Sequence, residues 1–153
     1  MPGSALVKKK GLAHVAADQW QQNLTVCFVD GKGNCVFAKK DIMAGEMIGY
    51  CEGYEISNHT KYSLYLEGKI IEATGILRNL SHSCDPNAFF IDDKRWLYAL
   101  RDIQKGMEIT IDYERTEAII SNPFICRCGS PNCRRVIDGS SRGASTKYRC
   151  LRE

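Results

Sequence analysis

The middle of the chain reads Arg78-Asn79-Leu80-Ser81-His82-Ser83-Cys84-Asp85-Pro86-Asn87. This stretch is polar and ends in a turn-forming Asp-Pro-Asn, whereas the sequence on either side of it is strand-like. Two later segments are candidates to meet it: Glu108-Ile109-Thr110-Ile111-Asp112-Tyr113 and the cysteine cluster of Cys126, Cys128 and Cys133. We expect these three pieces to fold together into one site.

Length and charge narrow the class of protein. At 153 residues the chain can form one domain that buries a core without disulfides. Its net charge of +3 is mild, and its Lys and Arg residues are not gathered in the stripe typical of nucleic-acid binders, so direct nucleic-acid binding is disfavoured. The sequence has neither an apolar run near the roughly 18 residues of a membrane span nor a secretory signal. We therefore expect an intracellular protein with no membrane partner, and the sequence does not separate nucleus from cytoplasm.

Short apolar runs recur along the chain, separated by Gly, Asn or Asp at intervals of about 8 to 12 residues. They predict strands over residues 24–29, 35–38, 47–51, 62–66, 69–73, 88–91, 96–100 and 108–113. Short helices are predicted over 14–22 and 114–120. This pattern is typical of a mostly β domain made of several small sheets.

Eight cysteines could form either disulfides or a metal site. Cys126 and Cys128 have one residue between them and are poorly placed to bridge each other. Because the chain also lacks an export signal, thiolate metal ligation in a reducing compartment is the better interpretation. Cys27, Cys35, Cys51 and Cys150 are then spare, and we expect such cysteines to be small core residues.

The spacing Cys126-x-Cys128-x4-Cys133 supplies three thiols within eight residues. Zinc takes four tetrahedral ligands in structural sites, so a fourth must come from elsewhere in the chain. Cys84 is the best candidate, and His82 beside it is the chief competitor. A free-standing zinc knuckle that uses Cys150 remains an alternative. Four thiolates leave no position for substrate, which favours a structural zinc over a catalytic one.

Seven segments carry a family resemblance. They are Gly33 to Ala38, Asp41 to Gly49, Ile71 to Thr74, Arg78 to Asn87, Arg101 to Glu108, Asp112-Tyr113 and Cys126 to Arg134. Taken in series, they resemble a SET-domain protein-lysine N-methyltransferase with a C-terminal post-SET zinc motif, over about Asn23 to Ile137. The resemblance implies several small curved β-sheets with a C-terminal pseudoknot and a zinc-bound post-SET segment. It divides the chain into an arm (1–22), the SET domain (23–115), the post-SET segment (116–138) and a basic flexible tail (139–153).

The activity implied by the resemblance is methyl transfer from S-adenosyl-L-methionine to a lysine side chain of a protein or peptide substrate, with histones as one candidate class. Tyr113 matches the family's catalytic tyrosine. Cofactor contacts fall by position on Gly33, Asn34, Arg78, Ser81, His82 and Tyr113. The substrate channel falls on Tyr50, Ile111 and Tyr113. The Zn²⁺ ligands fall on Cys84, Cys126, Cys128 and Cys133.

Several positions depart from the family pattern. Cys35 replaces the second glycine of the cofactor loop, and Ser81 replaces an asparagine, which removes an amide and its hydrogen bonds. Cys51 falls where a tyrosine is expected, and Met107 replaces a glutamate. These departures motivate a second interpretation: a catalytically impaired SET-like zinc module that binds a peptide or a partner protein.

Ile111 occupies a position where the family has Phe or Tyr and which is tied to the number of methyl groups added. A side chain without a hydroxyl should not retain the water that crowds out further methylation. The hypothesis is therefore that the channel permits di- or trimethylation, although the sequence does not determine the degree of methylation.

Overall fold

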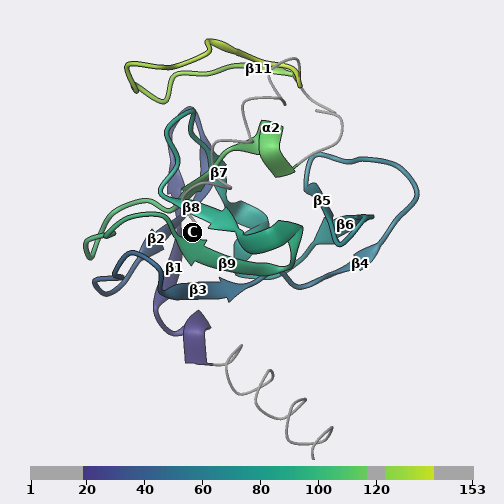
Figure 1. Ribbon diagram of the computed structural model, residues 1–153. Helices are drawn as coiled ribbons and strands as arrows, with labels where there is room; N and C mark the ends of the chain where they lie inside the picture. The colour runs from purple at the N-terminus through teal and green to yellow at the C-terminus, as the bar shows by residue number, and fades with distance from the viewer. Residues whose placement is uncertain (1–18, 117–122, 140–153) are drawn as a thin grey trace, which may run out of the picture.

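The structure, a computed structural model, describes residues 19–116 and 123–139. The β-strands are β1 (Leu24–Val29), β2 (Gly33–Ala38), β3 (Met47–Tyr50), β4 (Gly53–Glu55), β5 (Ser63–Leu66), β6 (Lys69–Ala73), β7 (Ser81–His82), β8 (Ala88–Phe90), β9 (Trp96–Ala99), β10 (Thr110–Ile111), β11 (Phe124–Ile125) and β12 (Val136–Ile137). The helices are η1 (Ile76–Asn79), η2 (Ile91–Asp93) and α2 (Tyr113–Thr116). Figure 1 shows short strands gathered into small sheets, with β11 beyond α2 at one end of the molecule.

Within the described residues the strands form five sheets of two or three strands each. Two of these sheets follow directly from local turn signals. The β1–β2 hairpin closes at Gly31 and Gly33, which both have positive φ. The β5–β6 hairpin turns through Glu67 and Gly68 at φ values of 56° and 73°, the left-handed pair that suits the twist of a tight hairpin. A mostly β fold of small sheets is therefore confirmed.

The parallel pair β7–β10 brings the middle of the chain to its later third. Ser81 pairs with Thr110 and His82 with Ile111. The side chain of Asn87 adds to this pairing, because its amide donates to Glu108 O at 2.8 Å and its oxygen accepts from the Thr110 N–H at 2.9 Å. The polar stretch and the segment before Tyr113 are thus held side by side, as the sequence predicted.

One core contact comes from the segment predicted to be an arm. Trp20 is 3% exposed, and its ring lies directly over Gly49 of β3. A Cβ added at Gly49 would approach Trp20 Cε3 to 2.7 Å, closer than real Cβ atoms approach other atoms. The glycine therefore makes room for the indole, and the residues just before β1 contribute to the core.

Trp20→Ala is expected to lower the free energy of unfolding by about 3 to 5 kcal/mol, because it leaves a cavity over Gly49. Urea denaturation followed by circular dichroism would measure this loss. Phe28→Ala is the control, since Phe28 is 71% exposed and its removal should change stability by less than about 0.5 kcal/mol. Equal effects of the two substitutions would contradict the assignment of Trp20 to the core.

Other sequence predictions differ from the structure in length. β1 and β6 begin and end where predicted, whereas the strand predicted over 108–113 is reduced to β10. Glu108 forms only an isolated bridge to Phe37, and Asp112 accepts a hydrogen bond from the Glu114 N–H that starts α2. The sequence pattern missed β4, β7, β11, β12, η1 and η2.

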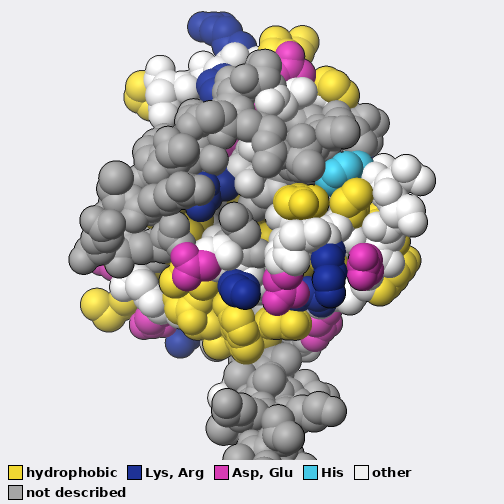
Figure 2. Space-filling model, turned by 45° about the vertical axis from the view of Figure 1, so that its right-hand side comes forward, with side chains coloured by type: hydrophobic (Ala, Val, Ile, Leu, Met, Phe, Trp, Pro, Cys, Tyr) yellow, Lys and Arg dark blue, Asp and Glu magenta, His cyan; other side chains and the backbone are white. Residues whose placement is uncertain are grey.

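The two predicted helices are only partly covered. Residues 19–21 are helical, and α2 spans Tyr113–Thr116; residues 14–18 and 117–120 lie outside the described part, as do Cys150 and the predicted tail after Gly139. None of the described helices is long and apolar enough to cross a membrane. On the face shown in Figure 2, acidic and basic side chains are interspersed, which fits the mild net charge.

Candidate functional site

A pocket of about 740 Å³ opens between three parts of the chain: the β1–β2 hairpin, the stretch from η1 to His82, and residues 124–128. Its volume lies within the roughly 300 to 1,000 Å³ typical of small-molecule sites. All six predicted cofactor-contact residues line it: Gly33, Asn34, Arg78, Ser81, His82 and Tyr113. The fold therefore collects these residues from separate segments around one space.

Tyr113 lies where this pocket meets a second, smaller cavity. The smaller cavity measures about 20 Å³, room for about one water molecule, and Ile111 contributes to its wall. Five residues line both spaces: Lys61, Tyr62, Arg78, Leu80 and Tyr113. The Tyr113 hydroxyl donates to Leu80 O at 2.5 Å, which fixes the end of the ring at this junction.

His82 supports Tyr113 through its ring. Its Nδ1 accepts a hydrogen bond from the Tyr113 N–H at 3.0 Å, which places the proton of a neutral imidazole on Nε2. That Nε2 lies 3.3 Å from Cys84 Sγ. Burial, reinforced by the charge of Arg134, lowers the pKa of His82 to about 4. His82 is therefore a neutral histidine whose ring helps to position the backbone of Tyr113.

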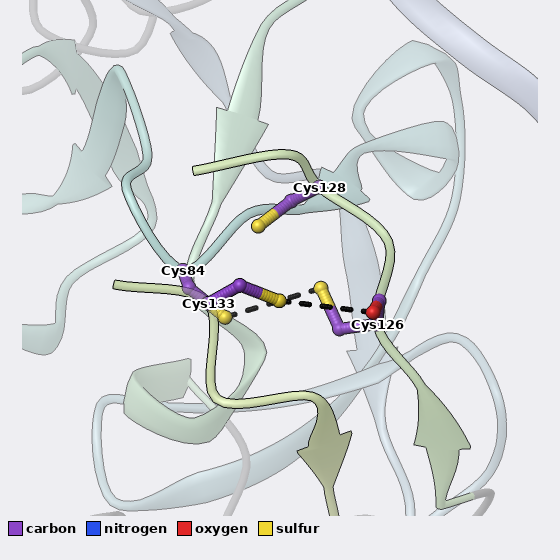
Figure 3. Close-up of side chains that lie close together, drawn as sticks. All are labelled: Cys84, Cys126, Cys128 and Cys133. Atoms are coloured by element: carbon purple, nitrogen blue, oxygen red, sulfur yellow. Dashed lines mark hydrogen bonds between the residues drawn. The ribbon is translucent and has the colours of Figure 1, made fainter. Parts of the chain in front are cut away.

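Four cysteine side chains converge beside His82. The sulfur atoms of Cys84, Cys126, Cys128 and Cys133 all lie within 4.8 Å of one another (Figure 3). Cys84 comes from the middle of the chain, and the other three from the segment between β11 and β12. The structure thus joins the fourth thiol to the local three, and His82 is outside this group.

The cluster has the donor set and size for zinc. Four sulfurs at about 2.3 Å from a tetrahedral Zn²⁺ stand about 3.8 Å apart, and Cys84 Sγ lies 3.9 Å from Cys126 Sγ. The Arg134 N–H points to Cys84 Sγ at 3.3 Å, an outer-shell contact that suits a metal-bound thiolate. These residues could hold a zinc ion.

The protonation of the thiols differs across the cluster. Burial raises the pKa of Cys84 and that of Cys126. Burial also acts to raise the pKa of Cys128, but hydrogen bonds with the side chain and backbone of Ser130 outweigh it and lower the value to about 6. Metal binding requires thiolates, so an ion in the cluster would offset the burial of the first two sulfurs.

Two departures from the family pattern touch each other. Ser81 Oγ donates to Cys35 Sγ at 3.3 Å, at the wall of the large pocket. Beside them Lys32 Nζ lies 2.6 Å from a carboxylate oxygen of Glu108. Burial raises the pKa of Cys35, which keeps it a neutral thiol. The hydroxyl and the thiol thus satisfy one another in the place of a glycine and an asparagine.

Two residues singled out from the sequence lie away from both cavities. The Tyr50 ring packs edge-on against Trp96, with centroids 4.8 Å apart, and Tyr50 lines neither space. The structure therefore does not bring Tyr50 to the predicted substrate channel, because β3 pairs with β9 and turns this ring onto the neighbouring strand. Cys51 is fully buried in the core, and burial raises its pKa to about 12.

Tyr62 is a site residue that the sequence analysis missed. It lines both cavities, and the Arg78 guanidinium stacks over its ring at 4.0 Å from the centroid. The only signal in the sequence was its place at the start of an alternating strand, which does not distinguish a pocket tyrosine from an ordinary one. Phe124 was missed too; its ring lies 5.7 Å from that of His82, on the pocket side of β11.

Comparison with known proteins places the chain in a family. The family model described as "SET domain" matches residues 33–114. The chain belongs to the SET-domain family. This match covers the pocket residues from Gly33 to Tyr113, the paired segments around His82 and Tyr113, and one of the four clustered cysteines. The pocket residues before Gly33 and those at 124–128 lie outside it.

Relatives of this SET domain are larger proteins. The chain is 30% identical over 134 residues to histone-lysine N-methyltransferase 2B of Homo sapiens, which covers 72% of this chain and 5% of that one. It is 38% identical over 82 residues to the H3 lysine-4 specific histone-lysine N-methyltransferase of Saccharomyces cerevisiae, covering 47% and 8%. The chain thus spans a small part of the length of the curated relatives that it matches.

A solved structure shares the fold. The crystal structure of KRYPTONITE in complex with mCHG DNA and SAH has a TM-score of 0.61 and 25% sequence identity, covering 74% of this chain and 28% of that one. Its DNA and its SAH are ligands of that protein. For this SET domain, the absence of a nucleic-acid partner stays a prediction.

Proposed function

We propose that this SET domain transfers methyl groups from S-adenosyl-L-methionine to a lysine side chain of a protein substrate. The observation that carries this proposal is the position of Tyr113 between a pocket of about 740 Å³ and a narrow cavity of about 20 Å³. One space has the size for a cofactor, and the other is a small cavity with the same tyrosine in its wall. The histone-lysine methyltransferase names of its relatives and the SAH in the KRYPTONITE complex support the same reaction.

In this proposal the large pocket binds the donor. Gly33, Asn34, Ser81 and His82 contact it largely through backbone groups. Among the described lining residues there are basic side chains, Lys32, Lys61, Arg78 and Arg127, but no carboxylate, which suits the carboxylate of an amino-acid ligand. S-adenosyl-L-methionine would supply a methyl group on a sulfonium, and transfer to an amine is an in-line displacement that alignment accelerates.

The narrow cavity would prepare the attacking lysine. A lysine amine must be neutral to accept a methyl group, yet its ordinary pKa is about 10.4. Leu77, Leu80 and Ile111 give the cavity apolar walls, and desolvation there lowers the pKa of an amine. A phenol that donates to a carbonyl keeps acceptor lone pairs, so the Tyr113 hydroxyl can orient the amine or help its proton leave.

The zinc, in the same proposal, is structural. Cys84, Cys126, Cys128 and Cys133 would bind it, with no ligand position left for substrate. It would hold residues 124–128 as one wall of the pocket. We also propose the division into a SET domain over 23–115 and a post-SET segment over 116–138. An intracellular location, with histones as one candidate substrate class, rests on the relatives' names.

Radiolabelled methyl transfer tests the proposal. The chain is incubated with tritiated S-adenosyl-L-methionine and either core histones or a whole-cell lysate, and labelled proteins are resolved on a gel. We expect the label to appear on lysine side chains of a substrate protein, and we expect excess S-adenosylhomocysteine to suppress this labelling. If no protein is labelled but calorimetry shows micromolar binding of S-adenosylhomocysteine, the proposed methyl transfer is wrong. The assignment of the large pocket to the cofactor would still stand.

A second candidate function is an inactive module that binds a peptide or partner protein. The contact between Ser81 and Cys35 favours it, because these two groups bond to one another where the family presents an amide. The inactive module would give no heat of binding for S-adenosylhomocysteine at micromolar concentration. Such a result, combined with peptide binding, would replace the enzymatic proposal.

Ile111→Tyr is expected to shift the product toward monomethyl-lysine by several-fold. Ile111 is buried and lines the small cavity, so a hydroxyl placed there could hold the one water for which the cavity has room. Mass spectrometry of a methylated peptide would give the mono-, di- and trimethyl fractions. Ile111→Phe is the matched control, because it adds a ring without the hydroxyl. A wild-type protein that stops at monomethyl-lysine would contradict the expected role of Ile111.

A further inference from the structure

Arg134 joins the cysteine-bearing segment to the residues on both sides of Tyr113. Its Nη2 donates to Asp112 Oδ1 at 2.7 Å and its Nη1 to Asp112 Oδ2 at 3.1 Å, a two-pronged contact. Its Nε lies 2.9 Å from Glu114 Oε1. The two carboxylate side chains are 4% and 1% exposed. One guanidinium therefore supplies the counter-charge shared by two buried acids that flank the proposed catalytic tyrosine.

Asp112 has a further task at this point. Its Oδ1 also accepts a hydrogen bond from the Glu114 N–H at 3.0 Å. The carboxylate that pairs with Arg134 therefore also caps the turn that carries Tyr113. Glu114 Oε2 in turn accepts the Gly139 N–H at 2.7 Å. The C-terminal segment thus contacts the Tyr113 turn through charges and hydrogen bonds as well as through the cysteine cluster.

The backbone after Arg134 is strained. Arg135 has φ of 68°, and the Val136 N–H donates to Arg134 O at 2.8 Å, which closes a tight three-residue turn. Non-glycine residues in this conformation persist where the surroundings hold them. Here the Arg134 side chain is anchored on one side and the β11–β12 pair on the other. The tight turn at Arg135 thus directs the Arg134 side chain toward Asp112 and Glu114.

We infer that Arg134 is a positioning residue for methyl transfer: it fixes the turn that presents Tyr113, by a route separate from the metal. This inference rests on the proposed function for its kinetic consequence. A zinc site of four thiolates holds the segment by its sulfurs, but none of those sulfurs contacts Asp112 or Glu114 in the described contacts. Removing the guanidinium leaves both buried carboxylates without this counter-charge, and the turn relaxes toward solvent.

The test compares Arg134→Gln, Arg134→Lys and, as a matched control, Arg101→Gln. Arg101 also pairs with an aspartate, but both side chains are about half exposed, at 51% and 52%. We expect Arg134→Gln to keep the wild-type zinc content and KM for peptide while kcat falls about 100-fold, the scale of a displacement near 1 Å. Arg134→Lys should recover part of kcat, and Arg101→Gln should match wild type.

Hydrogen exchange gives a readout that does not need turnover. Amide exchange in residues 112–116, measured by mass spectrometry on zinc-loaded protein, should be faster in Arg134→Gln and unchanged in Arg101→Gln. Wild-type exchange in Arg134→Gln, or a loss of kcat that only follows loss of zinc, overturns the inference. If the wild type shows no turnover, the proposed function is wrong instead. The exchange rates still decide whether Arg134 fixes the turn that carries Tyr113. If Arg134→Gln does not fold, Arg134→Lys and Glu114→Gln answer the same question.

Discussion

Tyr113→Phe is expected to lower kcat for methyl transfer by about 10²- to 10⁴-fold, the range attributed to a positioned acid–base group. The hydroxyl that this variant lacks lies at the junction of the two cavities and donates to Leu80 O. The ring remains, with its tilted contact to His82 and its edge contact to Phe124. The affinity for S-adenosylhomocysteine should therefore stay within about twofold of wild type, because the pocket loses only one oxygen.

Steady-state kinetics on a peptide that the wild type methylates would measure kcat, and calorimetry would measure the affinity for S-adenosylhomocysteine. Tyr65→Phe is the matched control, since Tyr65 is exposed on β5 and lines neither cavity. A Tyr113→Phe variant that keeps its kcat would show that the hydroxyl is not needed. A variant that loses cofactor binding would make Tyr113 a structural tyrosine of the pocket rather than a catalytic one.

The pocket could be predicted because its residues are held by local chemistry in an ordered series. The Asp-Pro-Asn turn, the glycines of the β1–β2 hairpin and the cysteine spacing each have a conformational signature. Matching such segments in sequence order to the SET-domain resemblance assigned six residues to cofactor contact. That role stays a prediction, and all six residues line one space. Cys84 also followed from this reasoning, since a tetrahedral site with three local thiols needs one ligand from a distance.

Other parts of the site depend on contacts between segments that carry no local signal. An alternating strand fixes which side chains share a face, but not which face meets the pocket, so Tyr62 was overlooked. Tyr50 was assigned to the channel only because it lies beside the position where the family has a tyrosine, and its ring packs on Trp96 instead. The contact between Ser81 and Cys35 joins positions 46 residues apart. Likewise, Trp20 packs over a glycine of β3, which local helix signals do not reveal.

Removal of one cluster thiol is expected to cost the protein its zinc and much of its cofactor affinity. Cys84→Ser should lower zinc affinity by well over the roughly 10- to 100-fold that the loss of an outer-shell partner costs, because it removes a ligand itself. Structural zinc contributes about 10 to 16 kcal/mol to small folded units at neutral pH. Residues 124–128 form a wall of the large pocket, so the affinity for S-adenosylhomocysteine should fall with the metal content.

Zinc content is measured by elemental analysis and by release to a chromophoric chelator, and cofactor affinity by calorimetry. Cys27→Ser is the matched control. Cys27 is exposed on β1, so the expectation that it is a core residue was wrong, and it lies outside the cluster. Cys150→Ser separates the two ligand sets: it should keep one zinc per chain if Cys84 is the fourth ligand, and lose it if a free-standing knuckle forms. If Cys84→Ser keeps its zinc and Cys150→Ser loses it, the zinc does not link the C-terminal segment to the pocket. The metal would then have no part in closing the site, and the segment would be held against the Tyr113 turn by Arg134, the Gly139–Glu114 hydrogen bond and the Phe124 ring.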